Sequence, residues 1–201
     1  MGDRWNLEQI LEAGPLPETI LSPIDGAEMV LVPEGEFTMG ITESELQQVF
    51  LLDERENFVF ATEVPARKTH LRAYYIDRYP VTNFQYRKFI GATGHRASLL
   101  LDHPQWGQPM QPVVFVGWED ARQYAKWADK SLPTEPQWEK AGRGTDGRWW
   151  TWGHDFEPGK CNSREYGLER TSEIGLFDQG ISPYGCYNMC GNVWEMCEGQ
   201  W

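Results

Sequence analysis

The stretch SPYGCYNMCGNVWEM, residues 182–196, decides how the rest of the chain is interpreted. It contains Cys186 and Cys190, and Cys197 follows directly, so three of the four cysteines of the chain lie together. Their separations do not match the CxxC spacing of a zinc site, and none of the four histidines is close to them in sequence. We therefore expect free thiols that pack as small buried side chains.

Large aromatic side chains are frequent along the 201 residues, which include ten Trp, nine Phe and eight Tyr. Each such ring can bury about 150–250 Å², and from Arg143 onward turn-forming Gly and Asp residues surround Trp149, Trp150 and Trp152. We expect ordered loops held by buried rings, with little regular secondary structure. These three tryptophans could instead stack on a ligand, but core packing is the simpler interpretation.

The charge and hydropathy of the chain exclude two classes of partner. Its formal charge is −12 and its basic residues are scattered, which argues against binding to the phosphates of nucleic acid. No stretch approaches the roughly 18 apolar residues of a membrane span. The first residues lack the apolar core of a signal peptide, so the sequence predicts a cytoplasmic location.

Two segments have the patterns of strands. Residues 27–40 show alternating apolar positions on both sides of Pro33-Glu34-Gly35-Glu36, which predicts a β-hairpin with its turn at these four residues. Residues 68–79 alternate over their length and predict one further strand. Before them, residues 1–24 have a helical pattern at Leu7, Ile10 and Leu11. We interpret residues 1–24 as an N-terminal arm and residues 25–201 as one domain.

Helices are expected to be short and few. Residues 43–60 are acidic and helical in character, and residues 118–128 place small and aromatic side chains on one face. Two further helices begin with a capping box, a threonine followed three residues later by glutamine. These boxes are Thr82 with Gln85 and Thr134 with Gln137, and the helices are predicted to span 82–90 and 134–141.

Four segments in fixed order carry a resemblance to a known family. They are MVLVPEGEFTMG (29–40), YYIDRYPVTNFQYRKFI (74–90), QPVVFVGWEDARQYAKWADKSLPTEPQWEKAGRG (111–144) and SPYGCYNMCGNVWEM (182–196). Together they resemble the sulfatase-modifying-factor, or formylglycine-generating-enzyme, domain family. The resemblance implies an α+β fold of the C-type-lectin-like kind with little regular secondary structure, and one that is incomplete at its C-terminus.

The resemblance leaves the enzyme question open. In the family's copper enzymes a cysteine pair follows an Arg-Gly-Gly-Ser turn downstream of the GNVWE-type segment, and residues 196–201 contain neither. The sulfoxide synthases of the family bind iron through histidines of a separate N-terminal helical domain. We therefore expect no catalytic and no cofactor-binding residue in this chain, and the sequence does not support binding of copper or iron. We predict that the domain is a binding or regulatory module for a protein or a small-molecule ligand. The alternative is an oxidoreductase of either type, if the gene product continues past residue 201.

Calcium is the one metal that the resemblance favours. It implies a site formed by Asn188, Gly191, Val193 and Glu195, with side-chain and carbonyl oxygens of the kind calcium prefers. A second site would use Asn162 and the Ser163 carbonyl group. In the alternative interpretation, Asn188 and Glu195 only satisfy backbone groups of the turn.

The same resemblance predicts an uncovered face near the C-terminus. In the family, a later segment covers the Trp-rich face, and without it Trp194 would lack packing partners. A large exposed apolar patch favours association, so we expect a partner chain or self-association through this face.

Overall fold

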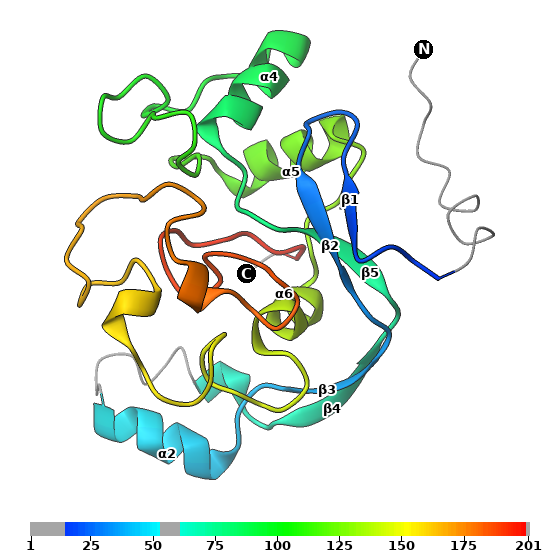
Figure 1. Ribbon diagram of the computed structural model, residues 1–201, viewed down its shortest axis with the longest axis vertical. Coiled ribbons are helices and arrows are strands. Elements are labelled where there is room, and N and C mark those ends of the chain that lie inside the picture. Colours follow the sequence, from blue (N-terminus) through cyan, green and yellow to red (C-terminus); the bar gives the residue numbers. More distant parts are fainter. Residues whose placement is uncertain (1–14, 53–60, 200–201) are drawn as a thin grey trace.

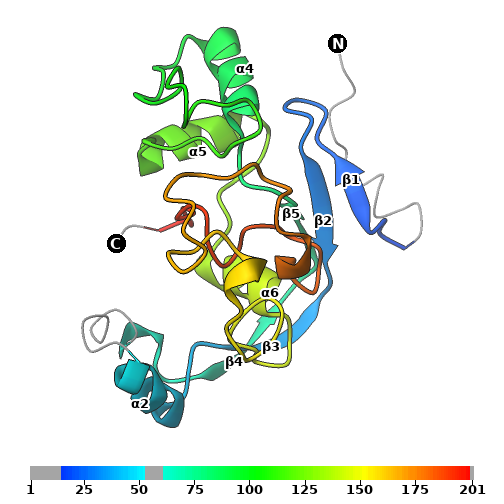
Figure 2. The same ribbon diagram turned by 60° about the vertical axis from the view of Figure 1, so that its left-hand side comes forward.

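The computed structural model describes residues 15–52 and 61–199, so the predicted helical pattern at Leu7, Ile10 and Leu11 lies outside the described residues. Figures 1 and 2 show short helices and strands connected by long irregular segments, as expected for an α+β fold with few regular elements. The strands are β1 (Thr19–Leu21), β2 (Glu28–Val32), β3 (Gly35–Met39), β4 (Arg67–Leu71) and β5 (Tyr74–Asp77). The α-helices are α2 (Glu43–Leu52), α4 (Asn83–Thr93), α5 (Trp118–Trp127) and α6 (Glu135–Arg143), and the 3-10 helices are η1 (Ala61–Glu63), η2 (Pro158–Lys160) and η3 (Asp178–Gly180).

The strands form two antiparallel sheets, and the predicted hairpin at residues 33–36 is wrong. β2 pairs with β1 and β5, whereas β3 pairs with β4, so the chain passes from one sheet to the other at Pro33 and Glu34. Lys140 fixes this crossover, because its buried ammonium group donates to the carbonyl oxygens of Pro33 at 2.7 Å and Gly35 at 2.9 Å. Strand periodicity identifies a strand without identifying its partner, and that is why the hairpin prediction failed.

The prediction of a single strand for residues 68–79 is also wrong, because this segment forms two strands. β4 ends at Leu71 and β5 begins at Tyr74, and each belongs to a different sheet. The register places Met29 opposite Asp77 and Phe37 opposite Thr69, so residues 28–39 and 67–77 run antiparallel across both sheets. β1 joins β2 at the outer edge of the larger sheet, and residues from the predicted arm therefore contribute to that sheet (Figure 1).

The helix starts predicted from capping boxes are confirmed. Thr82 and Thr134 each accept a hydrogen bond from the backbone three residues later, and the glutamine side chains reach back to the N-cap residues. α4 continues past Gly91 to Thr93 and ends at Gly94, whose φ of 71° suits a residue without a Cβ atom. Each capping box contributes about 1 kcal/mol, which matters for helices of this length.

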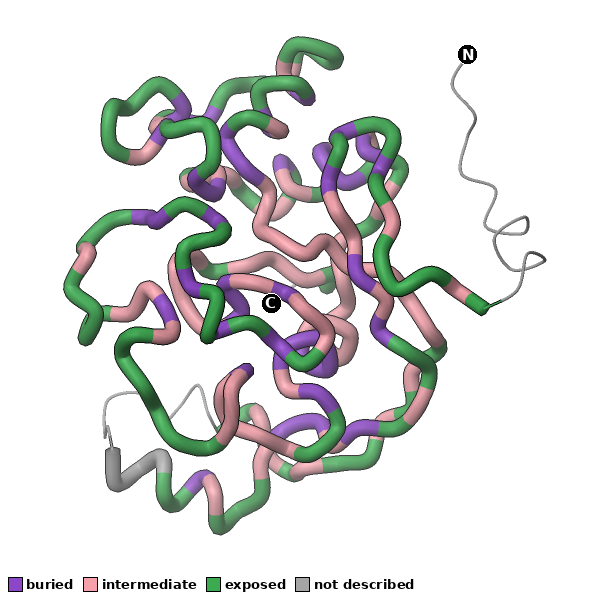
Figure 3. The backbone as a smooth tube through the Cα atoms, viewed as in Figure 1, coloured by how far each residue is buried: buried purple, intermediate pink, exposed green. Residues whose placement is uncertain are grey.

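Two buried clusters hold the domain together. One joins β2, α6 and the loop 184–189, and its buried members are Val30, Val32, Ala141, Cys186 and Met189. The other joins α4 and α5, and its buried members are Tyr86, Phe89, Leu101, Tyr124 and Ala128. Figure 3 shows buried positions concentrated on these inner segments, with the outer loops exposed. All four cysteines are free, as the sequence predicts, and Cys161 and Cys186 are buried.

Residues 145–199 form an irregular layer in the described structure, with only η2 and η3 as short helical turns. The layer is anchored by aromatic side chains: the rings of Trp150 and Trp152 stack at 5.7 Å, and Phe156 lies 4.9 Å from Trp150. No helix among the described residues combines the length and the apolar character needed to cross a bilayer.

Candidate functional site

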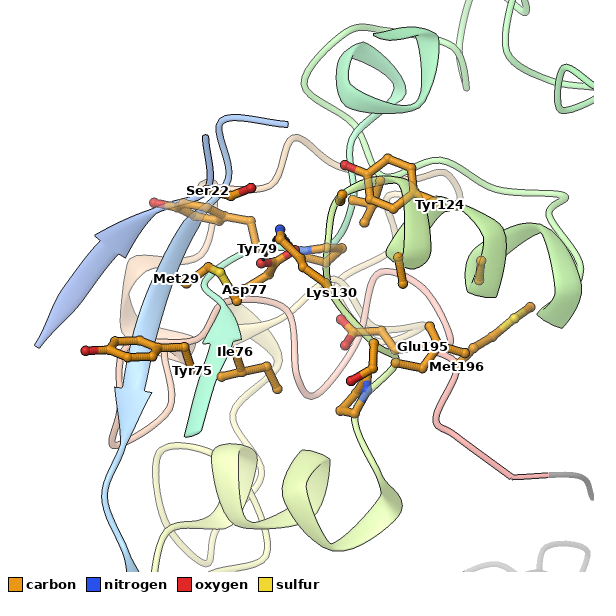
Figure 4. Close-up of a pocket in the computed structure, with 18 of the residues that line it drawn as sticks. Ser22, Met29, Tyr75, Ile76, Asp77, Tyr79, Tyr124, Lys130, Glu195 and Met196 are labelled. Carbon is orange, nitrogen blue, oxygen red and sulfur yellow. Dashed lines mark hydrogen bonds and ion pairs between the residues drawn. The ribbon is translucent and has the colours of Figure 1, made fainter. Parts of the chain in front are cut away.

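A cavity of about 790 Å³ lies between the larger sheet, α5, the loop 128–133 and the C-terminal segment 187–196. Figure 4 shows side chains from β2, β5 and α5 converging on it together with residues of the C-terminal segment. Most of its wall is apolar, and Met29, Leu31, Ile76, Val116, Leu132 and Met196 are representative. A concave apolar site of this size, with a few polar groups, is typical of small-molecule binding sites in proteins.

A charged network occupies the inner side of this cavity. The Lys130 ammonium group contacts both carboxylate oxygens of Asp77, at 2.7 and 2.9 Å, and one oxygen of Asp25 at 2.8 Å. Tyr124 donates its hydroxyl to the same Asp25 oxygen at 2.8 Å. The Asp25 side chain is fully buried, that of Lys130 is 12% exposed and that of Asp77 is 21% exposed. This network links the loop after β1, strand β5 and the loop after α5.

The two aspartates of the network differ in proton affinity. Burial raises the pKa of Asp77, and the attraction of Lys130 offsets this only in part. Burial also opposes ionisation of Asp25, but Lys130 and hydrogen bonds from neighbouring groups outweigh it and hold the pKa below its usual value. For Tyr124, burial and the adjacent Asp25 raise the pKa, so its hydroxyl stays protonated and acts as a donor.

Glu195 is the polar group that the C-terminal segment contributes to the cavity. One of its carboxyl oxygens accepts a hydrogen bond from the Trp138 indole at 2.8 Å. Burial raises the pKa of Glu195 to about 7, and the nearby charge of Asp77 acts in the same direction. In the described part of the chain no cation contacts this carboxyl group. Figure 4 shows the Glu195 side chain pointing from the C-terminal segment toward the strand that carries Asp77.

Aromatic rings border the same cavity. The rings of Tyr79 and Tyr187 lie 4.7 Å apart with a tilt of 33°, and both line the wall. Trp194 also lines the cavity, yet its side chain is 100% exposed. The apolar indole of Trp194 is therefore exposed to solvent next to the apolar opening of the cavity.

The residues predicted to bind calcium do not all face this cavity. Val193 and Glu195 line it, whereas Asn188 lies in a buried turn and donates its side-chain amide to the Ile174 carbonyl at 2.8 Å. The Gly191 carbonyl oxygen accepts the Val193 amide at 2.9 Å. No contact in the described structure joins the amide of Asn188 to the carboxyl of Glu195.

The second predicted calcium pair lies beside the same turn. Asn162 donates its side-chain amide to the Arg170 carbonyl and to the Asn192 side chain, at 2.8 and 3.0 Å. The Ser163 carbonyl accepts the Gly167 amide at 3.4 Å. Asn192, which sequence reasoning missed, has a φ of 72° and also holds the backbone of Ser172.

Only some of the oxygens predicted to bind calcium are engaged in hydrogen bonds. Calcium takes six to eight oxygen ligands. The Gly191 and Ser163 carbonyl oxygens and one Glu195 carboxyl oxygen accept hydrogen bonds. Asn188 and Asn162 donate through their amide nitrogens, which are not the atoms that bind calcium. Among the described residues no group of three or more His, Cys, Asp or Glu side chains converges in a way that could hold a metal ion. We therefore derive no chemistry through calcium, and its binding at these residues stays a prediction.

Sequence reasoning also missed the Lys130 network. Arg78 pairs with Glu28 at 3.1 Å, whereas Asp77, next to it in the sequence, belongs to the cavity. No local pattern could reveal this, because Lys130 is separated from Asp77 by 53 positions and from Asp25 by 105.

The chain matches known proteins over most of its length. Residues 18–201 match the model of the sulfatase-modifying factor enzyme 1-like domain. The chain is 32% identical to the uncharacterized protein YfmG of Bacillus subtilis, over 90% of this chain and 44% of that protein. It is 31% identical to the formylglycine-generating enzyme of Streptomyces coelicolor, over 92% of this chain and 74% of the enzyme. It is 30% identical to the inactive C-alpha-formylglycine-generating enzyme 2 of Bos taurus, over 86% of this chain and 71% of that protein.

Solved structures give the same result for the fold. PvdO from Pseudomonas aeruginosa superposes with a TM-score of 0.69 at 25% identity, over 91% of this chain and 74% of PvdO. Treponema denticola variable protein 1 superposes with a TM-score of 0.61 at 16% identity, over 93% of this chain and 81% of that protein. The chain thus spans less than half of the Bacillus protein but about three quarters or more of these two structures.

Proposed function

The chain belongs to the sulfatase-modifying factor enzyme 1-like domain family, and from this premise we propose that the domain is a non-catalytic module that binds a small organic ligand. The observation that carries the proposal is the cavity of about 790 Å³ beside the C-terminal segment. Its apolar wall supplies binding area, and the groups of Asp77, Lys130 and Glu195 supply orientation.

The state of the thiols supports the non-catalytic part of the proposal. Burial raises the pKa of Cys186 to about 12 and that of Cys197 to about 11, and it also raises the pKa of Cys161 and Cys190. A thiolate, and not a thiol, acts as nucleophile and as ligand for a soft metal. All four sulfur atoms are therefore poorly suited to oxidation chemistry at neutral pH.

The relatives include both a catalytic and an inactive protein, so similarity alone does not decide whether this chain is catalytic. Both the Streptomyces enzyme and the inactive bovine protein are about equally similar to this chain. A fold shared by active and inactive members does not decide activity, which depends on the groups at the site.

The non-catalytic proposal is tested by direct comparison with an active relative. The chain and the Streptomyces coelicolor enzyme are each incubated with copper(I), oxygen and a peptide containing Cys-x-Pro-x-Arg. Aldehyde formation is measured by mass spectrometry and oxygen uptake with an electrode. We expect turnover by the Streptomyces enzyme only. Aldehyde formation by this chain above the protein-free background would overturn the proposal.

The binding part of the proposal is tested with a neutral fluorescent probe of apolar sites, Nile red. Ala121 lines the cavity from α5, and Ala121→Trp places an indole in that space. Lys126→Trp adds the same indole at an exposed position of the same helix and is the matched control. We expect the probe to bind the original chain and the control, and to lose most of its signal with Ala121→Trp. Equal signals from all three would show that the cavity is not the binding site.

Calcium binding stays a separate prediction from the sequence. If Asn188 and Glu195 are ligands, calcium raises the melting temperature of the domain and Asn188→Ala removes this effect. Calorimetric titration of the EDTA-treated chain measures binding directly. The absence of both heat and stabilisation at millimolar calcium would contradict the prediction.

A further inference from the structure

β5 is an edge strand of the larger sheet. The strand order is β1-β2-β5, so in the described structure β5 has a neighbouring strand on one side only. The Arg78 amide donates to the Glu28 carbonyl oxygen at 2.8 Å, and residues of an antiparallel pair bond to the partner strand at every second position. The register therefore turns the backbone N–H and C=O groups of Tyr75 and Asp77 away from β2.

These outward backbone groups have no partner in the described part of the chain. No hydrogen bond there engages the backbone N–H or C=O group of Tyr75 or Asp77. Their side chains bond elsewhere, because the Tyr75 hydroxyl donates to the Pro17 carbonyl oxygen at 2.7 Å and the Asp77 carboxylate accepts from Lys130. Unpaired donors and acceptors at alternate positions of an edge strand are a template for one further strand.

The cavity provides room for such a strand beside β5. All residues from Ala73 to Asp77 line it, although the side chains of a strand alternate between its two faces. Residues of both faces line one cavity because that cavity runs along the open edge of β5. Figure 4 shows Glu195 and Met196 of the C-terminal segment across the cavity from this strand.

The opposite edge of the same sheet lacks this cavity. The Leu31 amide donates to the Glu18 carbonyl oxygen at 2.9 Å, so Thr19 and Leu21 are the outward residues of β1. Both are exposed, and neither lines the cavity. The outer edge of β1 is therefore an internal control for the edge of β5.

The walls beside the β5 edge are apolar on both faces of the sheet. Met29 and Leu31 lie opposite Asp77 and Tyr75 on one face, and Ile76 belongs to the other face. All of these residues line the cavity. Strands that are buried on both faces are apolar at consecutive positions, so these walls fit an uncharged apolar segment.

We propose that the cavity binds a short apolar peptide in extended conformation, which adds to the open edge of β5 as a fourth strand of the larger sheet. The inference rests on the proposed binding function and specifies the class of ligand. The peptide backbone pairs with Tyr75 and Asp77 and continues the ladder of β1, β2 and β5. Strand addition takes its affinity from main-chain hydrogen bonds and its specificity from the alternating side chains.

The test uses acetyl-Thr-Val-Val-Val-Thr-amide and two N-methylated forms of it. Successive residues of an extended peptide turn their N–H groups to opposite edges. Methylation of the second and fourth residues blocks one edge and leaves the other able to pair, whereas methylation of the second, third and fourth residues blocks both. These two forms differ by one methyl group and are the matched pair. Binding and amide hydrogen exchange of the isotope-labelled chain are measured by NMR.

We expect the parent peptide and the form blocked on one edge to bind. The form blocked on both edges should bind at least about tenfold more weakly, because leaving a buried backbone group unpaired is costly. The bound peptide should slow hydrogen exchange of the Tyr75 and Asp77 amides at least about tenfold and leave the Thr19 and Leu21 amides unchanged.

Two variants at one position test the same amide from the protein side. Tyr75→Ala and Tyr75→Pro both remove the tyrosine ring, and only proline also removes the outward N–H group. Proline is tolerated in an edge strand where the N–H group is not part of the ladder. We expect the parent peptide to bind Tyr75→Pro at least about tenfold more weakly than Tyr75→Ala. The methylated peptides decide the question on the original chain if the proline variant does not fold.

Equal binding of the two methylated peptides, or protection of Thr19 and Leu21 instead of Tyr75 and Asp77, would overturn the inference. Slow exchange of the Tyr75 and Asp77 amides before peptide is added would also overturn it, because the edge would then be covered by the chain itself or by a second copy. Failure of all three peptides while Nile red binds would overturn strand addition and leave the binding function intact. Failure of the peptides and of Nile red would overturn both.

Discussion

Removing the charge of Glu195 is predicted to stabilise the folded chain, whereas most substitutions destabilise it. Its pKa is raised by burial from the ordinary 4.5 to about 7, so the folded state binds this proton more tightly than the unfolded chain does. The folded state then holds more protons between these two values, and the free energy of unfolding falls as the pH rises through this window. Below about 4.5 the carboxyl group is neutral in both states, and the penalty is absent.

The magnitude follows from the size of this interval. A tenfold change in proton affinity corresponds to about 1.4 kcal/mol, and the interval from 4.5 to about 7 gives an upper limit of about 3 kcal/mol. The residue is only partly buried and faces a cavity that water can enter. We therefore expect about 1–3 kcal/mol of destabilisation by the charged form. Glu195→Gln removes this penalty and keeps the hydrogen bond from Trp138.

The assay is urea unfolding of the original chain and of Glu195→Gln at several pH values from about 5 to about 8, in EDTA to exclude metal ions. The difference in stability should be less than about 1 kcal/mol at the acidic end, and the variant should be more stable by about 1–3 kcal/mol at the basic end. Asp102→Asn removes a charge from a side chain that is 88% exposed and pairs with Arg87 at the surface, and it should follow the original chain within about 0.5 kcal/mol throughout. A Glu195→Gln variant that is less stable at the basic end would refute the assignment of an uncompensated carboxylate at this position.

Four further predictions test other parts of the structure. Lys130→Met should cost about 3–5 kcal/mol in urea unfolding, because it leaves two largely buried carboxylates without a cation; Lys126→Met, at an exposed position, should cost less than about 0.5 kcal/mol. Thr134→Ala should cost about 1 kcal/mol through loss of the capping box, and an unchanged stability would contradict the observed hydrogen bonds. Cys186, with its pKa raised to about 12, should resist iodoacetamide in the folded chain and react in urea, as followed by mass spectrometry. Trp194→Ser should reduce self-association in sedimentation velocity, and identical profiles for both chains would exclude this indole as the contact.

Local chemistry made the helices predictable from the sequence. A threonine and a glutamine three positions apart define a helix start because they satisfy two backbone amides within one turn. This is a short-range interaction, and α4 and α6 begin where it places them. The fold was predicted as well, because four segments in the same order resemble one family whose fold is known.

Pairings between distant segments were not predictable in this way. The crossover at Pro33 depends on Lys140, and the charge of Asp77 is balanced by Lys130 rather than by its neighbour in sequence. These contacts form only after the chain has folded, and each depends on a single long side chain that no periodic pattern singles out. The cavity was missed for the same reason, since its wall is assembled from segments spread over most of the chain.

The most direct test of the proposed binding site is a crystal structure of this chain with Nile red. We predict that the dye lies in the cavity between β2, β5, α5 and the C-terminal segment, with its rings against Met29 and Leu31. A dye bound elsewhere on the protein, with this cavity empty, would contradict the proposal.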